Sequence, residues 1–304
     1  MNARRPLMAL AAALVMPGLG HLYTGDIVRG LVVLVGVASA VPVCTWVALH
    51  VPPSALFGVV FLGVVVALGL YVACAFDAVR LAKLHATRTG LPYQRASVYV
   101  AYVLFGYLLV LRPAAAFARS EQLETFKIPS RSMLPSMVPG DRVFVDKSIG
   151  HPGGTQLWRG AIVVFIYPKE HSIFFIKRVI GLPGDIVEIS DDRVSVNGQA
   201  LITNGEGYCE PQDLFVARCI RERGDHGTYS VLVPSVPSSG EATRTWKIHE
   251  WQVFVLGDHR DTAVDSRSFG TVPLSDVVGV ARQIWFSSTK DSGVRWDRVG
   301  KVLE

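Results

Sequence analysis

Apolar positions are distributed unevenly along the chain. Residues 6–118 carry almost all of the hydrophobic surplus in long runs, whereas residues 119–304 alternate short apolar runs with polar and turn-forming residues. The segments 30–50, 55–76 and 96–118 each have about the 20 apolar residues that span the hydrocarbon core of a bilayer. The pattern predicts a membrane region over residues 1–95 with about two spans, a transmembrane anchor at 96–118 and a globular domain over 119–304.

The first apolar segment, residues 6–23, is interrupted by the sequence "PGLGHLY". Glycine and proline in the middle of a run break a helix, so a re-entrant or interfacial hairpin competes here with a fourth span. Three spans fit the flanking charges better than four.

Short runs rich in valine, isoleucine and phenylalanine follow residue 119 and are separated by turn signals such as "LPGD" and "VNGQ". They predict a mostly β domain with a hairpin at Asn197-Gly198. Residues 204–246 have a weaker pattern and are expected to form an inserted, partly flexible subdomain. The predicted strands are 142–146, 161–167, 174–180, 186–189, 194–196, 253–256 and 277–286.

Composition agrees with a membrane protein, because half of the residues are hydrophobic, only 18% are charged and the mean hydropathy is +0.35. The loop between the second and third spans contains Arg80, Lys83, Arg88 and Arg95 and no acidic residue. Basic loops stay in the cytoplasm, which predicts that residues 119–304 are extracytoplasmic. The net charge of +5 lies largely beside the membrane, and indicates contact with anionic lipids more than binding of nucleic acid.

The four cysteines divide between the two regions. Cys44 and Cys74 lie in predicted spans, where apolar packing is the expected role, and Cys209 and Cys219 lie in the β domain. An oxidising compartment would permit a disulfide between Cys209 and Cys219. Neither pair has the spacing of a zinc site, and we expect no metal and no organic cofactor.

Two serines follow the anchor in the stretch "KIPSRSMLPSMVPGD". In an extended segment the hydroxyls of Ser130 and Ser132 point the same way, and Pro129 and Pro135 stiffen the backbone around them. A serine-rich turn explains the same residues. A nucleophilic serine needs a base, and no nucleophile-elbow motif or obvious Ser-His-Asp order is present.

Lys177 is the candidate base. In "SIFFIKRVIG" a period of two places Phe175, Lys177 and Val179 on one face of a strand, so the amine is flanked by apolar groups. Burial lowers the pKa of a lysine, which a lysine base at neutral pH requires. An edge-strand lysine that reaches water is the alternative.

Three stretches in order behind an apolar anchor, "IPSRSMLPSMVPGD", "IKRVIGLPGD" and "LGDHRDTAVDSRSFGTVP", resemble the conserved boxes of bacterial type I signal peptidases. The resemblance covers about residues 124–287 and does not explain the chain before residue 96. It implies that Ser132 attacks the scissile carbonyl and that Lys177 is the general base. It also implies an oxyanion hole formed by the Ser130 hydroxyl and the Ser132 backbone N–H.

The family's cleft for small substrate side chains maps to apolar residues that would serve equally well as core. These are Phe126, Ile128, Met133, Met137, Phe175 and Ile176. The third box alternates charges, and either a buried ion-pair network bracing the site or a solvated turn fits that pattern. Its polar members are Asp258, Arg260, Asp265, Ser266 and Arg267.

Two positions depart from the family pattern. Ala263 stands where many members have a serine that helps to orient the lysine amine, so this bond is missing or is supplied by Thr262 or water. His259 replaces the more usual asparagine. Neither change removes the dyad.

These features predict a multi-pass serine endopeptidase of the bacterial cytoplasmic membrane that removes signal peptides from exported precursors on the outer face. Its partners are precursor proteins and membrane lipids, and its oligomeric state is open. Three rivals are a processing peptidase dedicated to one substrate such as a pilin, a catalytically silent membrane-anchored binding protein, and a multispanning transporter. The last is disfavoured because the spans carry few polar groups away from their ends.

Overall fold

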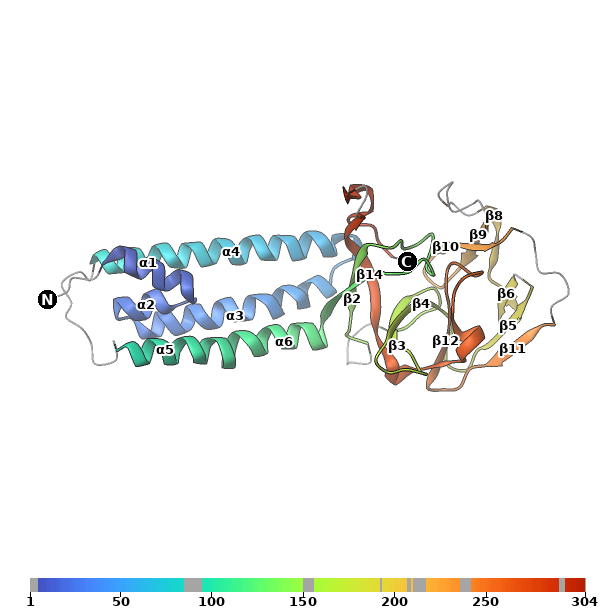
Figure 1. The fold of residues 1–304 in the computed structure, drawn as a ribbon, viewed down its shortest axis with the longest axis horizontal. Coiled ribbons are helices and arrows are strands. Elements are labelled where there is room, and N and C mark those ends of the chain that lie inside the picture. Colours follow the sequence, from blue (N-terminus) through green and yellow to red (C-terminus); the bar gives the residue numbers. More distant parts are fainter. Residues whose placement is uncertain are drawn as a thin grey trace. The chain divides into compact units, whose positions relative to one another are not determined.

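The computed structural model describes residues 5–84, 95–149, 156–191, 193–206, 209, 217–235, 242–289 and 293–303. Contacts divide the chain into two compact units, Met1–Gln122 and Leu123–Glu304 (Figure 1). The division falls three residues after the boundary expected near Arg119.

The described part of the first unit consists of helices joined by short turns. Three helical stretches, Ile27–Leu49, Pro53–Leu84 and Ala96–Glu121, are long and apolar enough to cross a membrane, which confirms the predicted N-terminal apolar helices. The basic loop between the second and third stretches falls mostly on residues 85–94, outside the described residues. The elements are α1 (Pro6–Val15), α2 (Leu19–Thr24), α3 (Ile27–Leu49), α4 (Pro53–Leu84), α5 (Ala96–Phe105), the π-helical turn η1 (Gly106–Leu111) and α6 (Arg112–Glu121).

The segment 6–23 forms two short helices, α1 and α2, instead of one span. The chain turns between them at Gly18, whose φ of +82° is accessible to glycine and strained for other residues. The Tyr102 hydroxyl donates to the carbonyl oxygens of Pro17 and Gly30, at 3.1 and 2.7 Å. The buried His21 Nε2 lies 3.1 Å from Asp77 Oδ2 on α4. These contacts fix the turn against the long helices.

The second unit is built on one mostly antiparallel eight-stranded sheet, as the strand pattern predicted. The strand order is β1-β2-β14-β3-β4-β12-β13, and β15 pairs with β14. The bounds are β1 (Leu123–Lys127), β2 (Asp141–Asp146), β3 (Ile162–Ile166), β4 (Phe174–Gly181), β12 (Gln252–Leu256), β13 (Val272–Pro273), β14 (Val277–Thr289) and β15 (Gly293–Val294).

Strand β4 lies inside this sheet, between β3 and β12. Lys177 is paired with Val163 of β3, and Arg178 is paired with Ile162 of β3 and Leu256 of β12. Alternate residues of β3 and β4 enter different apolar clusters: Val164 and Ile176 enter one, and Val163 and Val179 enter another. The sheet is therefore covered on both faces at β4, and a polar side chain there is enclosed.

Two smaller sheets complete the unit, with orders β11-β5-β6-β7 and β10-β9-β8. In the described part of residues 204–246, where an inserted subdomain was expected, β9 and β10 pair over seven residues and bury Ile220, Val231 and Val233. The bounds are β5 (Ile186–Ser190), β6 (Arg193–Val196), β7 (Gln199–Ala200), β8 (Ile202–Glu206), β9 (Ala217–Arg223), β10 (Thr228–Pro234) and β11 (Arg244–Lys247), with short helices α7 (Ser266–Phe269), η3 (Leu274–Asp276) and η4 (Trp296–Arg298).

Candidate active site

Ser130 and Ser132 lie on a loop that is closed at its base. The Ile128 N–H donates to the Asp141 carbonyl at 2.8 Å, and the Gly140 N–H donates to the Ile128 carbonyl at 2.9 Å. Gly140 has a φ of +94°, and a Cβ there would lie 2.0 Å from the Ser288 carbonyl oxygen, so the closure needs glycine. The two hydroxyl oxygens are 3.2 Å apart, as predicted, although the chain bends at Arg131 and turns from Ser132 onwards instead of staying extended.

A buried aspartate anchors this loop. The Asp141 carboxylate accepts from the Val138 N–H at 2.9 Å, from the Ser287 hydroxyl at 2.6 Å and from Arg298 at 2.7 Å. Sequence reasoning missed these three partners. An available signal was the repeated Pro-Gly-Asp turn: Asp185 in the second copy likewise accepts from the N–H three residues earlier, that of Leu182, at 2.8 Å.

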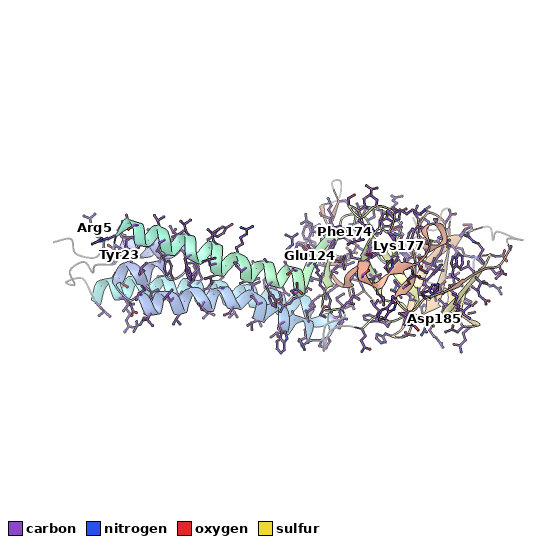
Figure 2. The ribbon with its side chains drawn as sticks, turned by 90° about the horizontal axis from the view of Figure 1, so that it is seen from below. Arg5, Tyr23, Glu124, Phe174, Lys177 and Asp185 are labelled. Carbon is purple, nitrogen blue, oxygen red and sulfur yellow. A yellow bond between two sulfur atoms is a disulfide. The ribbon has the colours of Figure 1, made fainter. Side chains whose placement is uncertain are left out.

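Lys177 lies on β4 in the second unit (Figure 2). Its Nζ lies 3.0 Å from Ser132 Oγ and 2.9 Å from the Ile176 carbonyl oxygen. The side chain is 4% exposed, and the Phe175 ring centroid lies 5.1 Å from Nζ. Burial lowers the lysine pKa from 10.5 to about 8, although Asp265 and Asp258 act in the opposite direction. An appreciable fraction of the amine is therefore neutral near pH 7 to 8.

The backbone of the third box holds Ser132 from the other side. The His259 N–H donates to the Ser132 carbonyl at 3.1 Å. A Cβ at Gly257 would lie 2.7 Å from that carbonyl oxygen and 2.3 Å from the Ala263 Cβ, so this close approach needs glycine. Lys177 Nζ contacts Ser132 Oγ and the Ile176 carbonyl oxygen, whereas the Thr262 hydroxyl, considered as a positioning partner, lies 2.7 Å from His259 Nδ1.

The polar residues of the third box form a buried network. Arg178 makes two bonds of 2.7 Å with the Asp258 carboxylate, and both side chains are buried. Arg260 pairs with Glu222 of β9 at 2.6 Å and also donates to the Gly257 carbonyl. The network therefore connects the β8–β10 sheet to the loop that contacts Ser132.

Asp265 begins α7 within the same network. Its carboxylate accepts from the Gly257 N–H at 3.0 Å and from Arg267 at 2.8 Å. The Ser266 hydroxyl accepts from the Val255 N–H at 3.0 Å. Backbone groups next to the dyad are in this way held by side chains of the third box, and Glu222 is the partner that sequence reasoning missed.

The six residues expected to line a cleft are not equally accessible. Ile128, Met133 and Met137 are fully buried in one apolar cluster together with Ile176, so they anchor the serine loop in the core of the domain. Phe126 packs on the edge of that cluster and contacts Phe174, with ring centroids 5.7 Å apart. Phe175 belongs to the cluster on the other side of the sheet.

Cys209 and Cys219 form a disulfide. It packs with Leu134, two residues after Ser132, and with Leu232 of β10. The disulfide therefore packs against the loop that carries Ser130 and Ser132.

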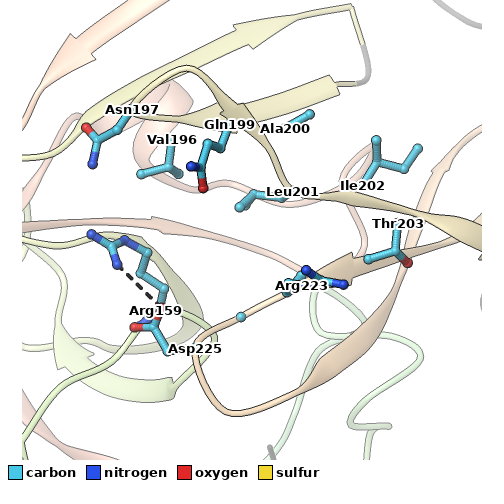
Figure 3. Close-up of a pocket in the computed structure, with 11 residues that line it drawn as sticks. Arg159, Val196, Asn197, Gln199, Ala200, Leu201, Ile202, Thr203, Arg223 and Asp225 are labelled. Carbon is cyan, nitrogen blue, oxygen red and sulfur yellow. Dashed lines mark hydrogen bonds and ion pairs between the residues drawn. The ribbon is translucent and has the colours of Figure 1, made fainter.

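A separate cavity of about 640 Å³ opens between the β6–β7 hairpin and the end of β9 (Figure 3). Polar side chains line it, among them Arg159, Asn197 and Gln199, and Arg159 pairs with Asp225 at its edge. Ser132 and Lys177 are not among its lining residues. In the described part of the chain, no group of three or more histidine, cysteine, aspartate or glutamate side chains could hold a metal ion.

The β domain that follows the three apolar helices thus places a serine hydroxyl beside a buried amine of lowered pKa, which is the arrangement that a serine hydrolase of the Ser/Lys class requires. The sequence profile described as "Signal peptidase, peptidase S26" matches residues 99–286. The chain belongs to this family, which confirms the resemblance and makes the protein a serine endopeptidase of the signal peptidase type.

Individual relatives agree with the family. The chain is 32% identical to Signal peptidase I of Pseudomonas fluorescens over 192 residues, which are 56% of this chain and 66% of that protein. It is 29% identical to Signal peptidase I of Buchnera aphidicola over 241 residues, covering 60% and 76% of the two chains. A crystal structure of a signal peptidase I from Enterococcus faecalis has 29% identity and a TM-score of 0.27, and covers 41% of this chain and 97% of that one. The match with the Pseudomonas protein thus spans slightly less than two thirds of its length.

Proposed function

We propose that this protein cleaves signal peptides from exported precursor proteins, with Ser132 as nucleophile and Lys177 as general base. The distance of 3.0 Å between Lys177 Nζ and Ser132 Oγ carries the proposal. A neutral amine at that distance can accept the hydroxyl proton as the oxygen attacks the scissile carbonyl. The lysine pKa of about 8 provides the neutral amine close to physiological pH.

The Ser130 hydroxyl and the Ser132 N–H form the oxyanion hole in this proposal. Ser130 is exposed, so its hydroxyl is free to turn from Ser132 Oγ towards a substrate oxygen. A donor aimed at the developing negative charge stabilises the tetrahedral intermediate more than the ground state. Leu134, Met133 and Met137 are buried beneath the loop and keep these donors in place.

The site is further proposed to face the outside of a bacterial cytoplasmic membrane. Basic residues before α5 favour a cytoplasmic start for the third apolar stretch, which would deliver residues 119–304 to the opposite side. The disulfide between Cys209 and Cys219 supports an oxidising compartment. A precursor held in the same bilayer by its own apolar segment would reach Ser132 at high effective concentration.

The test is processing of a precursor that carries an Ala-x-Ala site by the purified full chain in detergent micelles. N-terminal sequencing of the product should find cleavage directly after the second alanine. Ser132→Ala and Lys177→Ala should both lose processing while keeping an unchanged far-ultraviolet circular dichroism spectrum. Retained processing by either variant would refute the dyad.

A narrower substrate range is the second candidate function. The family match begins at residue 99, so α1 to α4 lie outside it, and the turn at "PGLGHLY" is a specific, well-packed feature of these helices. Such helices could select one precursor from many. Similar cleavage rates for several unrelated precursors would exclude this candidate, and rates differing by orders of magnitude would support it.

A further inference from the structure

The backbone of residue 259 holds the loop that carries Ser132. The His259 N–H donates to the Ser132 carbonyl oxygen at 3.1 Å. This bond restrains rotation about the Cα–C bond of Ser132, which is one of the two soft backbone torsions of that residue. The Ser132 hydroxyl oxygen lies 3.0 Å from Lys177 Nζ. The position of residue 259 therefore bears on the distance that the proposed reaction requires.

A short turn, residues 259–263, holds His259 in this position. The Ala263 N–H donates to the His259 carbonyl oxygen at 3.1 Å, which closes the turn through the backbone. Thr262 Oγ1 and His259 Nδ1 lie 2.7 Å apart, so a second hydrogen bond closes the same turn through the side chains. His259 is buried and Thr262 is exposed. The side-chain bond thus ties the exposed end of the turn to a buried ring.

Strand β10 holds the residues on both sides of His259 but not the end of the turn. The Leu232 N–H donates to the Asp258 carbonyl oxygen, and the Arg260 N–H donates to the Leu232 carbonyl oxygen, both at 2.8 Å. Residues 261–264 have two hydrogen bonds to the described part of the chain, and both of them go to His259. The imidazole is therefore the only side chain among the described residues that is hydrogen-bonded to this segment.

The end of the turn packs beside the Ser132 backbone. A Cβ at Gly257 would lie 2.3 Å from the Ala263 Cβ and 2.7 Å from the Ser132 carbonyl oxygen, so these groups are in close contact. The Ala263 methyl group cannot form a hydrogen bond with an amine. Lys177 Nζ contacts Ser132 Oγ and the Ile176 carbonyl oxygen. The geometry of the amine and the hydroxyl therefore depends strongly on where the backbone places Ser132.

We propose that Thr262 and His259 are positioning residues for Ser132. Their side-chain bond keeps the turn 259–263 closed, so that the His259 N–H stays directed at the Ser132 carbonyl and Ser132 Oγ stays within reach of Lys177. The inference rests on the proposed function. Both side chains act through the backbone of residue 259 and not on the substrate. Loss of the bond should therefore reduce the fraction of molecules in reacting geometry without changing substrate binding.

The first test is steady-state cleavage of a precursor with an Ala-x-Ala site by the full chain in detergent micelles. Thr262→Val replaces the hydroxyl by a methyl group of similar size, and should lower kcat about tenfold with KM unchanged. Thr262→Ser keeps the hydroxyl and should retain most of the wild-type kcat. Thr271→Val is the matched control, because it deletes a hydroxyl that donates to Gln252 at 2.6 Å, outside residues 259–263, and it should leave kcat unchanged.

A second measurement follows the bond itself and does not depend on activity. Nitrogen NMR of a chain with isotope-labelled histidine should show the His259 Nδ1 resonance, assigned by its absence from His259→Leu. This resonance should shift in Thr262→Val and return in Thr262→Ser, because the ring nitrogen loses and regains its partner. The double variant His259→Leu with Thr262→Val should be no slower than the slower single variant, since both substitutions remove the same bond.

Several outcomes would overturn the positioning role while leaving the proposed function intact. One is an Nδ1 resonance that does not move in Thr262→Val, which would mean that the bond is absent in solution. Another is a wild-type kcat in Thr262→Val, or a raised KM with unchanged kcat, which would assign Thr262 to substrate binding. Equal losses in Thr262→Ser and Thr262→Val, or additive losses in the double variant, would also contradict a shared bond. Failure of the wild-type chain to cleave the precursor would overturn both proposals.

Discussion

Lys177 and Arg178 are neighbours on strand β4 and lie on its opposite faces, where their surroundings differ. Arg178 makes two hydrogen bonds to the Asp258 carboxylate, a third to the Gly160 carbonyl, and lies over the Tyr229 ring. Lys177, one residue earlier, contacts a hydroxyl and a carbonyl oxygen, and among the described residues no carboxylate lies within hydrogen-bond distance of its amine. Both side chains are almost fully buried.

The difference lies in which protonation state each environment favours. Burial alone would lower the pKa of Arg178, but Asp258 raises it above its ordinary value, and the guanidinium stays charged. For Lys177 burial is the dominant cause, and its pKa falls to about 8. A single strand thus keeps a permanent cation beside an amine that can lose its proton, as the proposed role of Lys177 as general base requires.

The largest effect is expected from Lys177→Arg, which puts a permanently charged side chain on both faces of β4. The new guanidinium would lie beside Ser132, and an arginine cannot act as a base. We expect a fall of about 10⁴-fold or more in kcat/KM. In the wild type, kcat/KM should rise with pH to a plateau, with its midpoint near pH 8, as Lys177 loses its proton. A flat profile between pH 6 and 10 would contradict the role of this amine.

On the opposite face, Arg178→Met should damage stability. It leaves the Asp258 carboxylate buried without its cation, and breaking a buried pair in this way costs about 3–5 kcal/mol. Urea unfolding of the full chain in micelles, followed by hydrogen exchange of the β4 amides, would measure this. The double variant Arg178→Met with Asp258→Leu should recover part of the loss, because no unpaired charge remains. If the double variant were no more stable than Arg178→Met, the unpaired Asp258 carboxylate would not be the main cause of the lost stability.

The alternation of residues along β4 could be predicted from the sequence, and with it the position of Lys177 among apolar neighbours. Strands β2, β3, β4, β12 and β14 were predicted close to their observed bounds, because β-branched and aromatic runs between turn signals are a local property. The two hydroxyls of Ser130 and Ser132 were also correctly expected to lie together.

The partners of charged residues could not be predicted in the same way. Arg298, which pairs with Asp141, lies close to the C-terminal end of the sequence. Glu222, which pairs with Arg260, lies on β9, where consecutive charged residues of alternating sign obscured the alternation of buried and exposed positions. Such pairs depend on how distant strands come together, which a local pattern does not contain. The apolar residues near the serines posed a related problem, because cleft and core use the same side chains, and Ile128, Met133 and Met137 proved to be core.

A smaller kinetic effect is expected from Ser130→Ala. The residue is exposed, so its removal should leave folding unchanged, but it should cost one oxyanion donor and lower kcat by about 10²–10³-fold. Ser130→Thr keeps the hydroxyl and should retain most of the activity. The measurement is steady-state cleavage of a precursor by each variant. A rise in KM with unchanged kcat would instead assign Ser130 to substrate binding.

The smallest effect concerns the free energy of unfolding, which is lowered by burial of the charged Lys177 amine. The folded-state pKa of Lys177, about 8, is below its ordinary value of 10.5, so between these values the unfolded chain binds a proton that the folded chain does not. Stability should therefore rise with pH across this window, and the penalty should be fully present below pH 8. Lys177→Met removes the amine and should be more stable than the wild type at pH 7, by on the order of 1–3 kcal/mol.

This advantage should shrink as pH rises from about 8 towards 10.5, because the unfolded wild-type chain also becomes neutral there. Arg178→Lys, on the opposite face, keeps a cation beside Asp258 and should show no gain at neutral pH. Urea unfolding of the three proteins at pH 7, 8.5 and 10 gives the comparison. Two results would contradict this account: Lys177→Met less stable than the wild type at pH 7, or a stability difference between them that does not change with pH. Either would mean that the folded protein accommodates the Lys177 amine as a cation. The difference in surroundings between Lys177 and Arg178 would then not explain the proposed role of Lys177 as a base.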